Sequence, residues 1–221
     1  MTSGKPEGGN YYTLDEWLQV LQDNIVSCED CIARLDEQIT EAAGIDKIKG
    51  RFANRTFNTF RKDLQPKAYD TSVAVANAIV DGEPTNLFLT GGTGTGKTHL
   101  AVALTHYVAD RGIAVKFGNI TDLLHGIKQS FQGDSDEIDN IKNAPVLVID
   151  DLGKETDTAW VTETIYTIIN YRYENMLPTV VTTNLSMKEL QKRLGEATIS
   201  RLKEMCKDTY VNMDGEDYRL E

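Results

Sequence analysis

The sequence predicts an α/β fold, with a parallel sheet that is covered by helices on both faces in a doubly wound arrangement. Three observations support this prediction. From residue 86 onward, short apolar runs alternate with helical stretches, an order typical of βαβ units. The apolar runs are continuous, as in parallel strands that are buried on both faces. A glycine-rich loop joins the first run to the helical stretch that follows it.

The first 45 residues predict a helical segment that stands apart from the sheet. Thr13 and Glu16 form a capping-box pattern at its start, and Gly44 is a natural stop at its end. A helix with one apolar stripe needs a partner for that stripe. The segment either packs on its own chain or, as we expect, docks to another protein. The stripe repeats at spacings of four and three and consists of Leu14, Leu18, Leu21, Ile25, Cys28, Ile32, Leu35 and Ile39.

Residues 46–84 predict a basic linker and a lead-in helix. Residues 46–67 carry seven basic and two acidic side chains, whereas residues 1–45 carry two basic and nine acidic ones. The linker contains Phe57 and Phe60, which either pack near a nucleotide base or, as we favour, pack in the core. The small residues of the stretch 69–80 have helical spacing.

Residues 85–221 predict the domain that contains the sheet. The strands are expected at residues 87–89, 114–117, 146–149, 179–182 and 211–213. The helices are expected at residues 98–110, 121–131, 161–173, 186–194 and 197–205.

Composition narrows the possible classes of protein. The chain of 221 residues has no run of 18 apolar residues, and its start lacks the apolar centre of a signal peptide. Its three cysteines suit a reducing compartment, so we expect a cytoplasmic protein without membrane contact. Cys28 and Cys31 are interpreted as a core and an exposed cysteine rather than as zinc ligands. The net charge of −11 disfavours strong duplex binding, while single-strand contact through a groove or an oligomer stays open.

The loop Gly91–Thr98 reads G-x-x-x-x-G-K-T, the phosphate-binding loop of nucleoside triphosphatases. Glycines allow successive backbone N–H groups to surround one anion, and the following helix start adds partial positive charge. Lys97 is expected to reach the β- and γ-phosphates, and the Thr98 hydroxyl to bind Mg²⁺. The expected nucleotide-binding set is Gly91, Gly92, Thr93, Gly94, Thr95, Gly96, Lys97, Thr98 and His99.

Polar side chains follow two later strands. Asp150 and Asp151 end the apolar run 146–149, and acids at the carboxyl end of a buried parallel strand face the ligand crevice. Asp150 is the expected Mg²⁺ partner, and Asp151 is placed to orient or deprotonate the attacking water. Asn184 follows the next strand and could reach between the γ-phosphate and that water. The alternatives are acids that merely open a loop and an Asx-type turn.

Together these motifs resemble the DnaC/DnaI-type replicative helicase loaders, which are AAA+ ATPases, and the IstB-type ATPases of insertion elements share nearly all of them. The resemblance runs from about residue 51 to the C-terminus. It implies ATP and Mg²⁺ as cofactors, ATP hydrolysis, binding of a hexameric DnaB-type helicase, its delivery to single-stranded DNA, and self-association through the ATP site. It rests on the segments 51–57, 91–101, 146–153, 171–174, 178 and 182–185.

The resemblance also implies residue roles. Lys97 and Thr98 form the Walker A pair, Asp150 and Asp151 form the Walker B pair, and Asn184 is sensor 1. Arg201 matches the segment that carries the arginine finger, which would serve the ATP of a neighbouring subunit. Arg172 is a second candidate for an interface cation. The implied catalytic set is Lys97, Asp151, Asn184 and Arg201, with Thr98 and Asp150 on the metal.

The chain departs from the wider family in three respects. Position 151 is Asp, where most AAA+ proteins have Glu, which fits the loader subgroup and suggests slow intrinsic hydrolysis. A cysteine-rich zinc module at the front and a separate helical lid at the end are both missing from the pattern. The alternatives to a loader are a transposition helper of the same class, an adaptor that binds ATP with little turnover, and a small-molecule kinase, which the paired acids disfavour.

Overall fold

The structure is a computed structural model that describes residues 50–131, 136–215 and 217–218. The expected partner-binding segment at residues 1–45, with Cys28 and Cys31, lies outside these residues. The described elements are η2 Gly50–Phe52, η3 Phe57–Thr59, α3 Pro66–Val80, β1 Leu87–Gly91, α4 Lys97–Ala109, β2 Val115–Asn119, α5 Ile120–Ser130, α6 Glu137–Asn143, β3 Val146–Asp150, α7 Ala159–Glu174, β4 Thr179–Thr183, α8 Met187–Met205 and β5 Tyr210–Met213.

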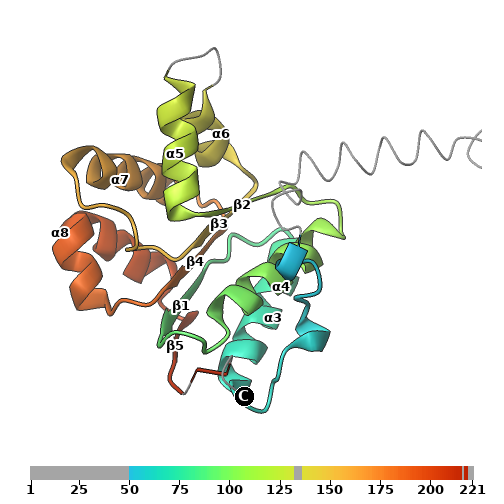
Figure 1. Cartoon of the computed structure of the whole chain (residues 1–221). Coiled ribbons are helices and arrows are strands. Elements are labelled where there is room, and N and C mark those ends of the chain that lie inside the picture. Colours follow the sequence, from blue (N-terminus) through green and yellow to red (C-terminus); the bar gives the residue numbers. More distant parts are fainter. Residues whose placement is uncertain (1–49, 132–135, 216, 219–221) are drawn as a thin grey trace, which may run out of the picture. The chain divides into compact units, whose positions relative to one another are not determined.

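The five strands form one parallel sheet in the order β2-β3-β4-β1-β5 (Figure 1). This confirms the α/β fold with a parallel sheet. Because all strands run the same way, the segments that follow β1, β3 and β4 emerge at the same edge of the sheet. These segments carry the glycine-rich loop, the paired acids and Asn184. The topology therefore brings the expected site residues to one edge.

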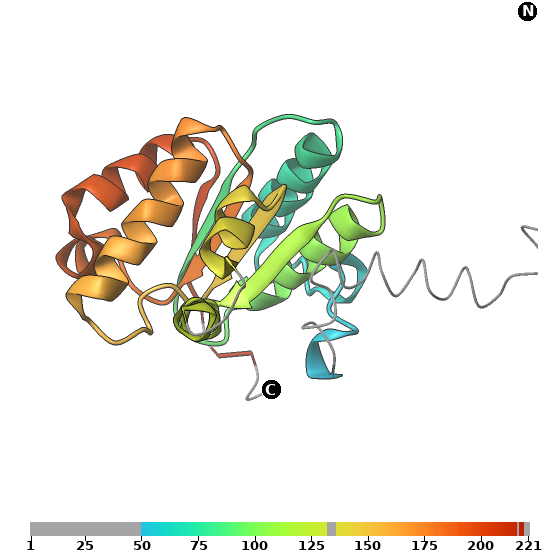
Figure 2. The same ribbon diagram turned by 90° about the horizontal axis from the view of Figure 1, so that it is seen from above.

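Helices cover both faces of the sheet (Figure 2). The helices α3 and α4 pack on one face with Leu87 and Leu89, while α5, α6, α7 and α8 pack on the other face with Phe88. Neighbouring side chains of β1 thus enter opposite cores, because successive Cβ atoms of a strand point to opposite faces. Both faces are apolar, which explains why the strands appear in the sequence as continuous apolar runs.

The helix boundaries follow local signals. Pro66 occupies the first turn of α3, where its missing N–H costs no hydrogen bond, and the Thr158 side chain accepts a bond from Val161 N at the start of α7. Gly195 has non-helical angles (φ 81°, ψ 162°) within α8, which confirms two helical stretches with a break between them. Sequence analysis missed α6, because its seven residues span too few turns to show a period.

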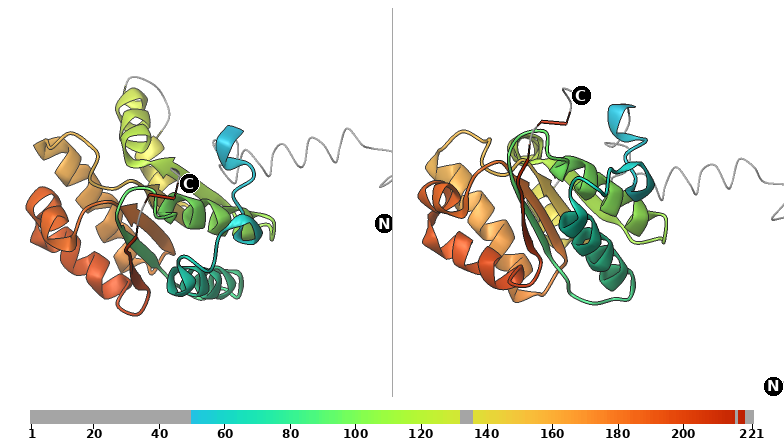
Figure 3. Two further views of the ribbon diagram at one scale, coloured as in Figure 1. Left: turned by 60° about the horizontal axis from the view of Figure 1, so that its bottom comes forward. Right: turned by 90° about the horizontal axis from the view of Figure 1, so that it is seen from below.

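The lead-in helix shares the core of the sheet domain. In α3, Ala68, Val75, Ala76 and Ile79 are buried in the cluster that covers one face of the sheet. The segment 50–60 lies beside α3 and α4 (Figure 3). The division of the chain at residues 45 and 84 stays a prediction.

Two further features concern the class of the fold. Among the residues that the structure describes, β5 is the last element and no helix follows it. No helix in this part of the chain has both the length and the apolar character that a membrane span requires.

Candidate nucleotide-binding site

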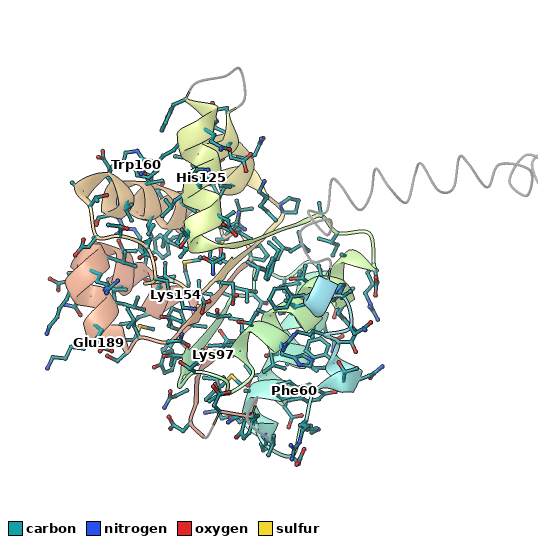
Figure 4. The ribbon with its side chains drawn as sticks, viewed as in Figure 1. Phe60, Lys97, His125, Lys154, Trp160 and Glu189 are labelled. Carbon is teal, nitrogen blue, oxygen red and sulfur yellow. The ribbon has the colours of Figure 1, made fainter. Side chains whose placement is uncertain are left out.

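A cavity of about 430 Å³ opens at the carboxyl edge of the sheet. It brings together the glycine-rich loop, both acids and Asn184, and Figure 4 shows Lys97 and Lys154 in this part of the molecule. Its lining residues come from the lead-in, the loop, β2, α5 and the segments after β3 and β4. They are Phe52, Arg55, Thr93, Gly94, Gly96, Lys97, Thr98, His99, Phe117, Gly118, Asn119, Asp122, Leu123, Asp150, Asp151, Lys154 and Asn184.

The loop depends on glycine at two close approaches. Gly96 caps α4 with φ +98°, and a Cβ there would lie 2.7 Å from Cε2 of Phe60. Gly91 has φ +133°, and its Cβ would lie 2.1 Å from the backbone oxygen of Met213. Both positions combine a left-handed backbone with a neighbour that leaves no space for a side chain. The loop is therefore held between the lead-in segment and β5.

The ammonium group of Lys97 is held against the loop. Its Nζ donates hydrogen bonds to Gly91 O at 2.9 Å, to Gly92 O at 2.6 Å and to Thr95 Oγ1 at 3.4 Å. Lys97 as a whole is only 5% exposed. A buried charge is stabilised by such hydrogen bonds, and they fix a positive charge within the loop, where an anionic phosphate group would be attracted to it.

Asp150 and Thr98 form the candidate Mg²⁺ site. The Thr98 hydroxyl donates to Oδ1 of Asp150 at 2.9 Å, across 52 residues of sequence. Burial raises the pKa of the Asp150 carboxyl, and the charge of Asp151 adds to this, while hydrogen bonds from Thr182 and Thr98 act in the opposite direction. A hydroxyl and a carboxylate side by side fit Mg²⁺, which proteins usually hold through one or two carboxylates and the substrate phosphates.

Asp151 directly follows β3 and has an unusual backbone conformation. Its φ of +60° is rare for a residue with a side chain. Oδ2 of Asp151 accepts from Lys154 Nζ at 2.5 Å and from Asn119 Nδ2 at 3.4 Å. The carboxylate thus faces the cavity, together with the exposed Asn184. Sequence analysis missed Asn119, because only the order of the strands brings β2 beside β3. It also missed Lys154, which is three positions from Asp151 but belongs to no motif.

His99 connects α4 to the lead-in. Its Nε2 lies 2.9 Å from the carbonyl oxygen of Thr56, which can only accept, so the ring donates this hydrogen bond. Burial lowers the pKa of His99, and the positive charge of Arg55 adds to this, against a raising effect of the Thr56 bond. His99 therefore lines the cavity and also anchors the segment beside it.

The aromatic residues of the lead-in divide into two groups. Phe57 and Phe60 pack against the core and do not line the cavity, as expected for the favoured alternative. Phe52 and Arg55 line it instead. Arg55 lies 5.5 Å from the ring centroid of Phe52. The sequence does not separate the two groups, because spacing alone does not show which side of an irregular segment faces the core.

The structure contradicts the interpretation of Arg172 as an interface cation. Arg172 is fully buried, and its guanidinium donates to Thr179 Oγ1 and to the backbone oxygens of Ile141, Lys142, Ala144 and Pro178. Burial lowers its pKa to about 10. A fully buried guanidinium that is bonded to internal acceptors does not reach a second subunit, and Arg172 instead joins the start of β4 to the turn before β3.

Arg201 lies on α8 and does not line the cavity. It is half-buried, and its guanidinium carbon lies 5.1 Å from the ring centroid of Tyr166 and 5.8 Å from that of Tyr173. Its Nη1 and Nη2 donate to Ala197 O and to the Tyr166 hydroxyl. Arg201 is therefore not part of the site of its own subunit.

Comparison with known proteins identifies the family. Residues 29–221 match the family described as IstB-like ATP binding protein. The chain belongs to this family. As a member of the IstB-like family with the parallel sheet described above, it is an ATP-binding protein of the AAA+ class of ATPases.

The relatives of this IstB-like protein include proteins that are named as helicase loaders. The crystal structure of the DnaC helicase loader superimposes with a TM-score of 0.64 and 30% identity, over 76% of this chain and 100% of that chain. The replicative helicase loader DnaC of Escherichia coli strain K12 is 31% identical over 63% of this chain and 58% of its own length. The phage-like element PBSX protein XkdC of Bacillus subtilis strain 168 is 29% identical over 86% of this chain and 76% of its own length.

Proposed function

We propose that this IstB-like protein is an ATP-dependent loader of a replicative helicase. It binds a hexameric DnaB-type helicase in the cytoplasm and delivers it to single-stranded DNA. The observation that carries the proposal is the 30% identity to a DnaC helicase loader over the whole compared chain, combined with a cavity in which the loop and both acids meet. The chain spans 58% of the length of the Escherichia coli loader. We propose helicase binding from this similarity.

The residues of the cavity have distinct roles in this proposal. The loop 91–98 and Lys97 hold the triphosphate, and Thr98 and Asp150 hold Mg²⁺, which neutralises phosphate charge when it is bound. Asp151 accepts a proton from the attacking water or orients that water, and Asn184 helps to position it. Oδ2 of Asp151 is paired with Lys154 Nζ, and this pair would have to break before Asp151 could act on water, which supports slow hydrolysis by the protein alone.

Self-association is proposed to complete the site. Arg201 does not line the cavity of its own chain, so we assign its charge contribution to the ATP of a second copy. An arginine that reaches across an interface can donate two parallel hydrogen bonds to phosphate oxygens, because its guanidinium group is planar. ATP at the interface would therefore favour the oligomer, and hydrolysis would weaken it.

A partly exposed aromatic cluster, formed by Phe131 and the half-buried Trp160, supports contact with single-stranded DNA. Phe131, at the end of α5, is 68% exposed, and its ring lies edge-on to Trp160 at a centroid distance of 6.5 Å. Lys128 Nζ lies 4.6 Å from the Trp160 centroid, and Figure 4 shows Trp160 beside α5. Exposed aromatics stack on bases and a cation attracts the backbone. The overall charge of −11 disfavours a broader nucleic-acid surface.

Two other functions use the same cavity. A transposition helper of the IstB type would act with a transposase, and the family description favours it as the second candidate. An adaptor would use ATP as a structural ligand. The residues of the cavity do not separate the transposition helper from the loader. The adaptor does differ, because it does not need Asp151 for its function.

The test is a co-purification experiment with a replicative helicase. The full chain is mixed with a hexameric DnaB-type helicase and ATP, and complex formation and phosphate release are measured with and without single-stranded DNA. The loader proposal expects a stable complex and stimulated phosphate release. Lys97→Ala should abolish ATP binding and leave helicase contact largely intact. The absence of any complex contradicts a loader, and a complex without turnover favours the adaptor.

A further inference from the structure

The hydroxyl of Thr182 contacts both acids of the candidate site. Thr182 lies in β4 and is fully buried. Its Oγ1 donates to Oδ1 of Asp150 at 2.5 Å and accepts from the backbone N–H of Asp151 at 2.9 Å. A hydroxyl has one donor and two acceptor positions, so both bonds can form together.

This contact lies where the sheet ladder stops. The pairing of β3 with β4 extends to Ile149 and Val181, and the chain then turns at Asp151 with φ +60°. At this turn the backbone N–H of Asp151 donates to the Thr182 hydroxyl, where a continued ladder would use a backbone carbonyl. The Thr182 carbonyl accepts from Leu152 N at 2.8 Å. Thr182 therefore forms hydrogen bonds with three consecutive residues, from 150 to 152.

Threonine suits this role for a second reason. A β-branched side chain within a strand has few allowed χ1 angles, so its hydroxyl keeps one direction. Asp150 is 6% exposed and depends on hydroxyl donors, namely Thr182 on one side and Thr98 on the other. Without the Thr182 hydroxyl, a buried carboxylate and a backbone N–H both lose a partner.

We propose that Thr182 is a positioning residue for ATP hydrolysis, which orients Asp150 toward Mg²⁺ and holds the Asp151 backbone in the conformation that directs its carboxylate into the cavity. The inference rests on the proposed roles of the two acids. It does not make Thr182 a ligand of ATP or of the metal. It therefore predicts a change in turnover and Mg²⁺ requirement without a comparable loss of nucleotide affinity.

The test compares Thr182→Val, which keeps the shape, with Thr182→Ser, which keeps the hydroxyl. We expect Thr182→Val to lower kcat and to raise the half-saturating Mg²⁺ concentration by about 10- to 100-fold. The KM for ATP and the affinity for a fluorescent ATP analogue in EDTA should change by less than about twofold, as expected when substrate contacts are intact. Thr182→Ser should recover most of kcat and the Mg²⁺ requirement.

The matched control is Thr105→Val, an equally buried threonine whose hydroxyl donates to Ala101 O of its own helix. If Thr182→Val does not fold, as judged by circular dichroism, Thr182→Ala is measured by the same criteria. Normal kcat and Mg²⁺ requirement in a folded variant without the hydroxyl overturn the inference, as does a folded Thr182→Ser with the defect of the valine variant. Asp151→Asn distinguishes the two proposals, because unchanged turnover in that variant would instead contradict the proposed hydrolysis mechanism.

Discussion

The Thr98 hydroxyl donates a hydrogen bond to Asp150, at 2.9 Å from Oδ1 and 3.2 Å from Oδ2. Thr98 lies in the first turn of α4 after the loop, and Asp150 ends β3, two strands away from β1 in the sheet. The two side chains that the sequence assigns to one metal ion are thus in direct contact. The contact joins the phosphate-binding and the acidic halves of the site.

This contact predicts a specific defect for Thr98→Val. Removal of the hydroxyl takes one Mg²⁺ partner away, and the half-saturating Mg²⁺ concentration for hydrolysis should rise by roughly tenfold or more. Titration of phosphate release against Mg²⁺ measures this. Thr105→Val is the control, since its buried hydroxyl on the same helix donates only to Ala101 O. An unchanged Mg²⁺ titration for Thr98→Val would contradict the assigned metal site.

The position of Arg201 outside its own cavity predicts complementation between two inactive variants. Arg201→Ala keeps the loop and the acids, whereas Asp151→Asn keeps the arginine. If Arg201 acts on the ATP of a neighbour, an interface is productive when one copy supplies Asp151 and the next supplies Arg201. Random mixing in equal amounts should make about a quarter of the interfaces productive and recover about a quarter of the wild-type turnover. Phosphate release from each variant and from the mixture checks this. A mixture no more active than its components would show that Arg201 does not act in trans.

The burial of Arg172 predicts a role in stability. Arg172→Met leaves several buried carbonyl oxygens without a donor, and we expect a loss of roughly 3 kcal/mol in the free energy of unfolding, or about 6–12 °C in Tm. Urea denaturation measures the change. The control is Arg111→Met, because the Arg111 side chain lies on the Tyr107 ring at the surface and should change stability by less than about 0.5 kcal/mol. Equal stability of the two variants would refute this role.

The aromatic cluster at the end of α5 predicts weaker single-strand binding by Phe131→Ala. Loss of one base-stacking ring should lower the affinity about fivefold or more. Fluorescence anisotropy with a labelled oligothymidylate at fixed salt measures this. Met176→Ala serves as control, because Met176 is 70% exposed but remote from the cluster in sequence and adjoins a different cavity. Unchanged affinity of the Phe131 variant would rule out this surface.

The parts of the molecule that could be predicted have local causes. The strands were recognised as continuous apolar runs, and all five occur close to the expected residues. The loop 91–98 was recognised because its glycines are a backbone requirement, which appears in the sequence itself. The break in α8 coincides with Gly195, a residue whose conformational freedom marks helix ends. Short α6 was missed for the opposite reason, since seven residues contain too little periodic signal.

The sequence by itself determined the fold class and the chemistry of the cavity, because strand runs, a glycine loop and acids at a strand end are patterns of neighbouring residues. Only the tertiary structure decided which polar residues meet. Thr182 contacts Asp150 and Asp151 from 31 or 32 positions away, and Arg172 is enclosed by carbonyl groups rather than exposed. Such contacts depend on the order of the strands in the sheet, and no spacing along a single chain encodes that order directly.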